Sequence, residues 1–140
     1  MRRVLVWLAV CWLAWGCGGV TEPTNDRVTL DSPELREMFP LSGREWPAQT
    51  YRDWWANMER CSGLTGDVGS VRWFTFHDPS VHWFWSPSNR PAGGAYLAND
   101  RAIILVPLYV TDQKRVEHEM LHALIGAPGH PPVFATCGVA

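Results

Sequence analysis

The chain has 140 residues with 12 Lys and Arg against 14 Asp and Glu, giving a net charge of −2. This length favours a single domain with one modest core. The near-neutral balance and the lack of a basic patch argue against a nucleic-acid partner.

The N-terminus has the layout of an export signal. A basic start, Met1-Arg2-Arg3, precedes an uncharged apolar run over residues 4–15 that is too short to span a bilayer comfortably. The alternative is a buried N-terminal helix, but the run shows no polar face at helical spacing. We therefore expect residues 1–16 to be a signal peptide that directs export to the cell envelope.

Cys17 directly follows this run. Gly16-Cys17 resembles the lipobox of bacterial lipoproteins, although Trp15 and Ala14 differ from its usual pattern. The resemblance implies a lipidated Cys17 that anchors the protein to the membrane. Residues 18–30 are polar and carry Pro23, which favours a flexible tether before a domain over residues 31–140. Simple signal cleavage, with a periplasmic or secreted product, is the alternative.

The predicted helices begin after the tether. Ser32-Pro33-Glu34 has the composition of a helix start, and we expect a short helix that ends before Pro40. Residues 49–61 form a stronger candidate because their large apolar residues recur at three- and four-residue steps. Ser62-Gly63 would end this second helix.

Two cysteines lie outside the signal, Cys61 and Cys137. In an oxidising compartment they most simply form a disulfide, which would close a long loop and contribute on the order of 4 kcal/mol in the chain-entropy model. An unpaired thiol pair, or Cys137 as a metal ligand, is the alternative.

The middle of the chain has the two-residue period of β-strands. Strands are predicted over residues 71–76 and 81–85, and over 94–98 and 101–106 as a hairpin around Asn99-Asp100. Trp83 and Trp85 would share a strand face, packing in the core or lining a groove. Pro107 would end the last strand or mark an edge.

The last helix is predicted over residues 113–125, with Thr111-Asp112 as its cap and Gly126 as its stop. Together the elements predict an α+β fold, with a helix packed on a mostly antiparallel sheet of about four strands, followed by this helix.

The last helix carries the sequence His118-Glu119-Met120-Leu121-His122, which matches H-E-x-x-H. Histidines four residues apart lie on one face of a helix, so both rings can reach one zinc ion. Glu119 can then act as a base on water. The alternative is a pair of solvent-facing histidines, which the apolar character of the helix disfavours. Glu117 points elsewhere and is expected in solvent or behind the site.

The stretch from His118 to His130 resembles the active site of zincin metallopeptidases, most closely the metzincin branch. The resemblance implies His118, His122 and His130 as ligands, Glu119 as general base, and a peptide substrate laid along an edge strand. Metzincins place the glycine and the last histidine three and six residues after the second histidine, whereas here the distances are four and eight.

The third ligand can also be considered from the residues alone. No Asp or Glu follows His122, which argues against the glutamate-ligand branch of zincins. His130 is the candidate downstream. His77, in a predicted turn, and His82, in a predicted strand, are rivals for which surface and sheet roles are favoured.

These observations predict an exported zinc-dependent metallopeptidase, monomeric, that acts on peptides or proteins. The substrate would pair with the strand ending at Val106 if that strand is an open edge. Two alternatives belong to other classes: a non-catalytic binding lipoprotein braced by zinc, and a surface lipoprotein that recognises protein or glycan through tryptophans.

Overall fold

The computed structural model describes residues 26–39 and 48–140. The predicted signal peptide, Cys17 and most of the predicted tether lie outside these ranges. The helices and strands are β1 (Leu35–Glu37), α1 (Gln49–Ser62), β2 (Arg72–Phe76), β3 (Phe84–Trp85), β4 (Pro91–Ala92), β5 (Gly94–Leu97), β6 (Ala102–Leu105), α2 (Gln113–Ile125) and α3 (Val133–Thr136). The fold class is α+β, as predicted.

The main sheet has four strands in the order β1-β2-β6-β5. β1 is antiparallel to β2, β2 is parallel to β6, and β6 is antiparallel to β5. The short strands β3 and β4 form a separate antiparallel pair. The expected sheet of about four mostly antiparallel strands is thus confirmed.

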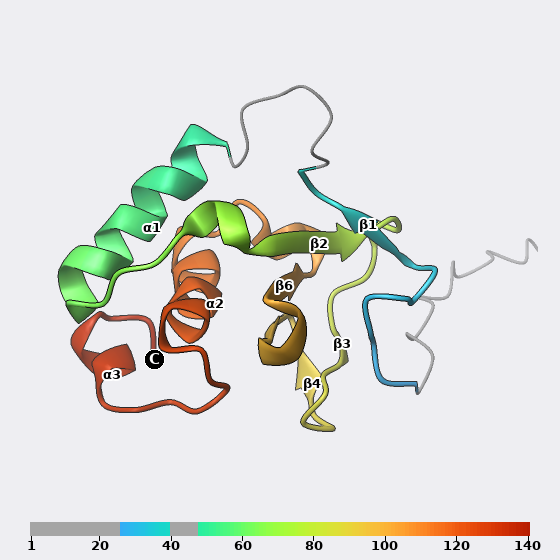
Figure 1. Ribbon diagram of the computed structural model, residues 1–140. Helices are drawn as coiled ribbons and strands as arrows, with labels where there is room; N and C mark the ends of the chain where they lie inside the picture. The colour runs from blue at the N-terminus through green and yellow to red at the C-terminus, as the bar shows by residue number, and fades with distance from the viewer. Residues whose placement is uncertain (1–25, 40–47) are drawn as a thin grey trace, which may run out of the picture.

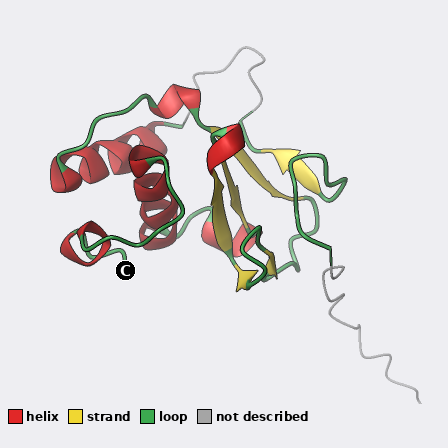
Figure 2. Ribbon diagram, turned by 60° about the horizontal axis from the view of Figure 1, so that its bottom comes forward, coloured by secondary structure: helices red, strands yellow, loops and turns green. Residues whose placement is uncertain are grey.

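Both faces of the main sheet are covered, and β6 shows this most clearly. Its side chains alternate: Ile103 and Leu105 pack with the helices, whereas Ala102 and Ile104 pack with Phe84 and the N-terminal segment. Figure 2 shows the helices gathered on one side of the sheet. The sheet therefore forms the middle of a layered domain, with α1 and α2 on its helical face.

Helix α1 packs as its sequence predicts. Tyr51, Trp55 and Met58, at three- and four-residue spacing, are buried, and Gly63 ends the helix with a positive φ of 70°. Tyr51 meets Trp73 of β2 edge to face, with ring centroids 4.8 Å apart. Aromatic packing thus fixes α1 on the sheet.

The helix predicted after Ser32 is wrong. Residues 35–37 instead form β1, which pairs with β2 between Leu35 and Phe76 and between Glu37 and Phe74. Ser32 does cap a local turn, since its hydroxyl accepts a hydrogen bond from the Thr29 N–H. The predicted turn is therefore present, but the residues after it pair with β2 at the edge of the sheet instead of forming a helix.

The segment before β1 is also packed. Val28 is buried, and its N–H donates to the Trp85 carbonyl over 3.1 Å. The C-terminal end of the predicted tether is therefore part of the folded layer beside β3.

The strand predicted over residues 81–85 is mostly irregular. Only Phe84 and Trp85 form β3. Phe84 is buried, whereas Trp83 and Trp85 are half-buried, with their ring centroids 5.8 Å apart. His82 is exposed rather than held in a sheet.

The predicted hairpin exists as β5 and β6, but its connection is longer than two residues. Ala98–Asp100 form a 3₁₀ turn and Arg101 has a positive φ of 47°. The expectation that β6 could be an edge is wrong, because β6 pairs with β2 and β5 on its two sides. The exposed edge on this side belongs to β5.

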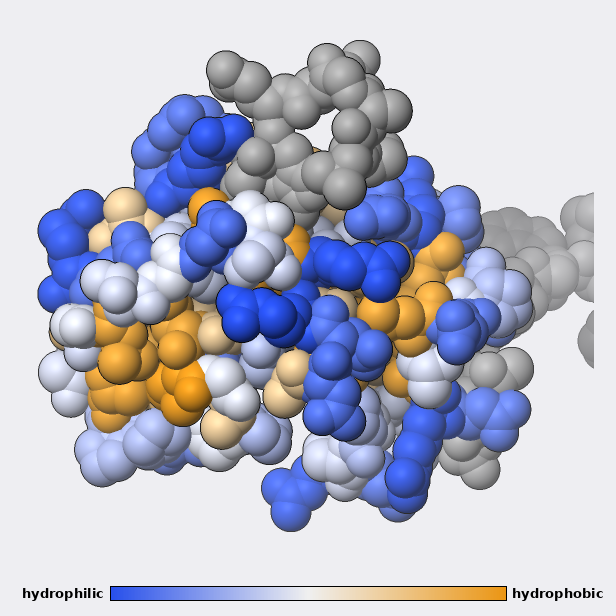
Figure 3. Space-filling model, viewed as in Figure 1, coloured by the Kyte–Doolittle hydropathy of each residue, from blue (hydrophilic) through white to orange (hydrophobic). Residues whose placement is uncertain are grey.

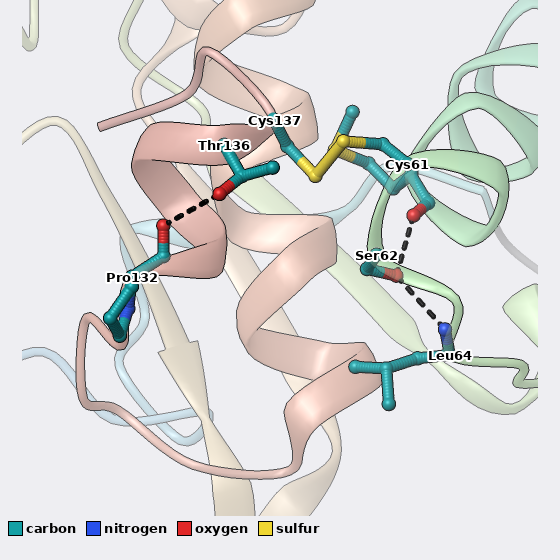
Figure 4. Close-up of a disulfide and its surroundings, with 7 residues drawn as sticks. Cys61, Ser62, Leu64, Pro132, Thr136 and Cys137 are labelled. Atoms are coloured by element: carbon teal, nitrogen blue, oxygen red, sulfur yellow. Dashed lines mark hydrogen bonds between the residues drawn. A yellow bond between two sulfur atoms is a disulfide. The ribbon is translucent and has the colours of Figure 1, made fainter.

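The predicted disulfide is present between Cys61, near the end of α1, and Cys137, directly after α3 (Figure 4). The bond joins residues 76 apart in sequence and ties the C-terminal segment to α1. It is consistent with an oxidising compartment.

The surface seen in Figure 3 is mostly hydrophilic at its centre, with hydrophobic residues gathered to the left, over the α1 and α3 region, and to the right, near β1. Leu64 and Leu108 are the exposed large hydrophobic residues of the described part. Within the described ranges no helix is long and apolar enough to cross a membrane.

Candidate metal centre

Helix α2 carries the candidate site and is closed at both ends. The Asp112 side chain accepts a hydrogen bond from the Arg115 N–H, and Gly126 ends the helix with a φ of 73° while donating to the His122 carbonyl. The bounds, Gln113–Ile125, are those predicted. Both ends of the histidine-bearing helix are thereby fixed.

The structure brings His118, His122 and His130 together. His118 and His122 lie one turn apart on α2, and the loop after Gly126 returns His130 to them. Each residue offers one ligand atom, and all three atoms lie within 4.8 Å of one another. His77 and His82 are exposed elsewhere, so His130 joins the helix pair, as predicted.

Backbone carbonyls set the orientation of two of these rings. His118 Nδ1 donates to the Val139 carbonyl over 2.6 Å, and His122 Nδ1 donates to the Ala127 carbonyl over 3.0 Å. Because a carbonyl oxygen can only accept, Nδ1 carries the proton in both rings. Their Nε2 atoms are therefore unprotonated and carry the lone pair that a metal requires.

The spacing of the nitrogens also fits a metal. His118 Nε2 and His130 Nε2 are 3.1 Å apart. Two nitrogens bound tetrahedrally at about 2.0–2.1 Å from one zinc ion would lie roughly 3.4 Å apart. Three imidazole nitrogens in this arrangement could hold a metal ion.

Phe134 of α3 packs against all three histidine rings. Its ring lies 5.0 Å from the His118 ring, 4.6 Å from His122 and 4.8 Å from His130, measured between centroids. Phe134 is buried, so it excludes water from the back of the site. The C-terminal segment therefore contributes both Phe134 and the Val139 carbonyl.

Burial keeps the helix histidines neutral. It lowers the pKa of His122 from 6.5 to about 4, against the opposing effect of the hydrogen bond to Ala127. Burial also lowers the pKa of His118, with smaller contributions of the same sign from His130, Arg115 and Lys114. Neutral imidazole is the form that binds metals.

Glu119 lies beside the cluster and is almost fully buried. Burial raises its pKa from 4.5 to about 8, with a small opposing effect from Arg115. The carboxyl group lies against β5, since a Cβ added to Gly94 would be 2.6 Å from Glu119 Oε1. Gly94 thus leaves the space that the Glu119 side chain occupies.

Glu117 is not in solvent. It is buried and accepts hydrogen bonds from Asn57 Nδ2 (3.2 Å) and Gln113 Nε2 (2.9 Å). It therefore links α2 to α1, on a different face of the helix from the histidines.

A cleft of about 460 Å³ lies over the three histidines and Glu119. One wall is the turn that joins β3 and β4, and the other is β5 with the loop that carries His130. The histidines and the acid therefore face a space open to ligands.

Sequence patterns identified the helix residues and His130 but missed the rest of the site. Phe134, Gly94 and the Val139 carbonyl reach it through tertiary contacts that no local motif marks. Spacing could reveal only residues that share α2. His130 could be inferred as well, because it is the one histidine that follows the motif in the sequence.

Comparison of the chain with protein-family models, with curated proteins and with solved structures found no match. The case for function therefore rests on the residues of the site.

Proposed function

We propose that this protein is an exported zinc-dependent metallopeptidase. The observation that carries the proposal is the shared cleft, in which three convergent histidines, a buried glutamate and an exposed strand edge meet. The H-E-x-x-H motif and the following histidine, which resemble those of zincins, support the same activity.

The donor set favours zinc. Three histidine nitrogens with a fourth position left open are typical of catalytic zinc sites. When bound, zinc would polarise the scissile carbonyl and make water a better nucleophile near neutral pH. His118, His122 and His130 would hold it, with the first two rings oriented by their carbonyl partners.

Glu119 would move the proton. As a carboxylate it accepts a proton from the attacking water while the water oxygen bonds to the peptide carbon. It then gives that proton to the amine nitrogen as the C–N bond breaks. Its place between α2 and β5 would put it beside a peptide lying on that strand.

The edge of β5 can hold an extended peptide. The Val106 N–H donates to the Gly93 carbonyl over 2.8 Å, so Gly93 faces β6. Backbone groups alternate along an antiparallel strand, which turns those of Gly94 and Tyr96 to the open side. Both residues line the cleft, and a substrate could add to the sheet there.

A non-catalytic role has one observation in its favour. A metal held by His118, His122 and His130 would cross-link α2 to the loop after it, while Phe134 packs beneath, and could therefore serve only to brace this small domain. A buried glutamate facing the cleft is not needed for such a brace.

The export and anchoring of the chain belong to the same proposal. The Cys61–Cys137 disulfide supports an oxidising compartment. Lipidation of Cys17 would be detected in the mass of the mature N-terminal peptide, where simple cleavage would leave an unmodified residue.

The function is tested by zinc content and peptide cleavage of the full-length protein with its disulfide formed. We expect one zinc per chain, greatly weakened binding in His130→Ala, and unchanged binding in the control His77→Ala. Glu119→Gln should retain zinc and lose cleavage of a peptide library by about 10²–10⁴-fold.

The outcomes separate the two roles. Zinc binding without cleavage of any library peptide would favour the brace. A protein that binds no zinc would contradict both, and full cleavage by Glu119→Gln would overturn the proposed base.

A further inference from the structure

Arg90 is the one basic side chain other than the histidines that lines the described cleft. It is exposed and is the last residue of the turn that joins β3 to β4. The other ionisable group that lines the cleft is Glu119, which is buried beside β5. The accessible fixed charge of the wall is therefore positive.

Hydrogen bonds hold the backbone at Arg90 in place. The Ser86 N–H donates to the Arg90 carbonyl over 3.0 Å, and the Asn89 N–H donates to the Ser86 carbonyl over 2.9 Å. The hydroxyls of Ser86 and Ser88 are 2.8 Å apart. The guanidinium thus projects from an ordered wall of the cleft.

Several arginines of the described ranges have side-chain partners within the protein, whereas the Arg90 side chain has none among the described residues. Arg72 lies 3.9 Å from Glu37, Arg101 donates to Ser70, and Arg115 stacks over Tyr109. No described carboxylate lies within ion-pair distance of Arg90, and no described ring or hydroxyl engages its guanidinium. A ligand carboxylate could therefore bind it without displacing a protein partner.

We propose that Arg90 determines substrate specificity and selects peptides with an Asp or Glu side chain close to the scissile bond. A guanidinium matches a carboxylate with two parallel hydrogen bonds, which favours an acidic side chain over its amide. The proposal rests on the proposed peptidase function and adds the class of substrate.

Binding tests the proposal without turnover. The probe is a set of labelled octapeptides of Ala and Gly, in which one Asp, Asn or Lys is moved through each position. Zinc-loaded, full-length Glu119→Gln protein should bind the best Asp peptide about two- to fivefold more tightly than the matching Asn peptide, as one exposed charge pair predicts. High salt should reduce this ratio.

Two further variants, in the same Glu119→Gln background, assign the effect to Arg90. Arg90→Glu should abolish the Asp preference and favour the Lys peptide. Arg36→Glu makes the same change of charge on β1, outside the cleft, and should leave the Asp-to-Asn ratio unchanged. Zinc content should be equal in both, which excludes a collapsed site.

Cleavage by the active protein separates this inference from the proposed function. Asp preference that depends on Arg90, found in binding but without cleavage, supports the specificity and overturns the peptidase. Cleavage with equal kcat/KM for Asp and Asn peptides supports the peptidase and overturns the specificity. Absence of both binding preference and cleavage overturns both.

Discussion

The position of Glu119 depends on the absence of a side chain at Gly94 of β5. Gly94 presents only hydrogen where a side chain would meet the Glu119 carboxyl group, since a Cβ there would be 2.6 Å from Oε1. The contact is with a carboxylate that has little room to move, because Glu119 is buried. The small residue thus acts as a positioning residue for the proposed base.

We predict that Gly94→Ala displaces Glu119 and lowers kcat at least tenfold, since misplacement of a base by a fraction of an ångström weakens proton transfer. KM should change less than kcat, and the zinc content should equal that of the wild type. Peptide cleavage and metal analysis on the same preparation measure both.

Gly129→Ala is the matched control, because a Cβ at Gly129 meets no atom within 4 Å. It should retain near wild-type kcat. An unchanged kcat in Gly94→Ala would mean that Glu119 has another position from which it works, or that it is not the base.

At single residues, the sequence could predict contacts within one helix but not contacts made by tertiary packing. His118, Glu119 and His122 follow from one helical turn, so their shared site could be inferred from spacing. Gly94 and Phe134 depend on which strand and which helix pack against α2. The sequence around Gly94 and Phe134 contains no pattern that predicts their contact with α2.

Among the elements, those with a strong internal period were predictable. α1 and α2 have apolar stripes and glycine stops, and their bounds match the prediction to within one residue. β1 has three residues and is held by its pairing with β2, whereas the residues before it have the composition of a helix start. The central place of β6 likewise depends on parallel pairing with β2, which no hairpin signal shows.

The C-terminal element α3 is small, and the disulfide joins it to α1. This four-residue helix carries Phe134, and Val139 follows it, so the support of the histidines depends on where the segment docks. The tie at Cys137 limits its freedom in the unfolded chain as well as in the folded one.

We predict that the double variant Cys61→Ser/Cys137→Ser loses on the order of 4 kcal/mol of unfolding free energy in the chain-entropy model for a loop of this length. Denaturant unfolding at fixed zinc concentration measures the loss. Zinc affinity should fall as well, because the Val139 carbonyl and Phe134 become less firmly placed.

His77→Ala, which alters an exposed residue away from α3, serves as control and should leave both quantities unchanged. If the double variant lost stability but bound zinc as tightly as the wild type, the C-terminal segment would be shown to support the fold alone.

At the scale of the whole molecule, the site lowers the unfolding free energy of the metal-free protein. The Glu119 carboxyl group and the His122 imidazole are buried and the His118 imidazole is half-buried, where each would otherwise be hydrated. A metal bound to the folded state alone would offset this cost by mass action. Stability should therefore depend on pH most clearly after the metal has been removed.

Glu119 and His122 affect stability in opposite directions, over pH ranges that overlap between 4.5 and 6.5. Glu119 has its pKa raised from 4.5 to about 8, so between these values the unfolded chain releases a proton that the folded chain keeps, and stability falls as pH rises. His122 has its pKa lowered from 6.5 to about 4, so the unfolded chain gains a proton first, and stability falls as pH drops through this range.

Because the two effects oppose each other between pH 4.5 and 6.5, we predict that the chelator-treated protein loses unfolding free energy mainly as pH rises from about 6.5 to 8. In Glu119→Gln the loss above pH 6.5 should shrink, whereas in His122→Asn the stability at pH 4.5 should be higher, relative to that at pH 6.5, than in the wild type. Denaturant unfolding across pH measures each slope, and comparing slopes removes the constant effect of each substitution. Equal alkaline slopes in the wild type and Glu119→Gln would show that the carboxyl group is hydrated in the metal-free protein, and its burial against β5 would then require the metal.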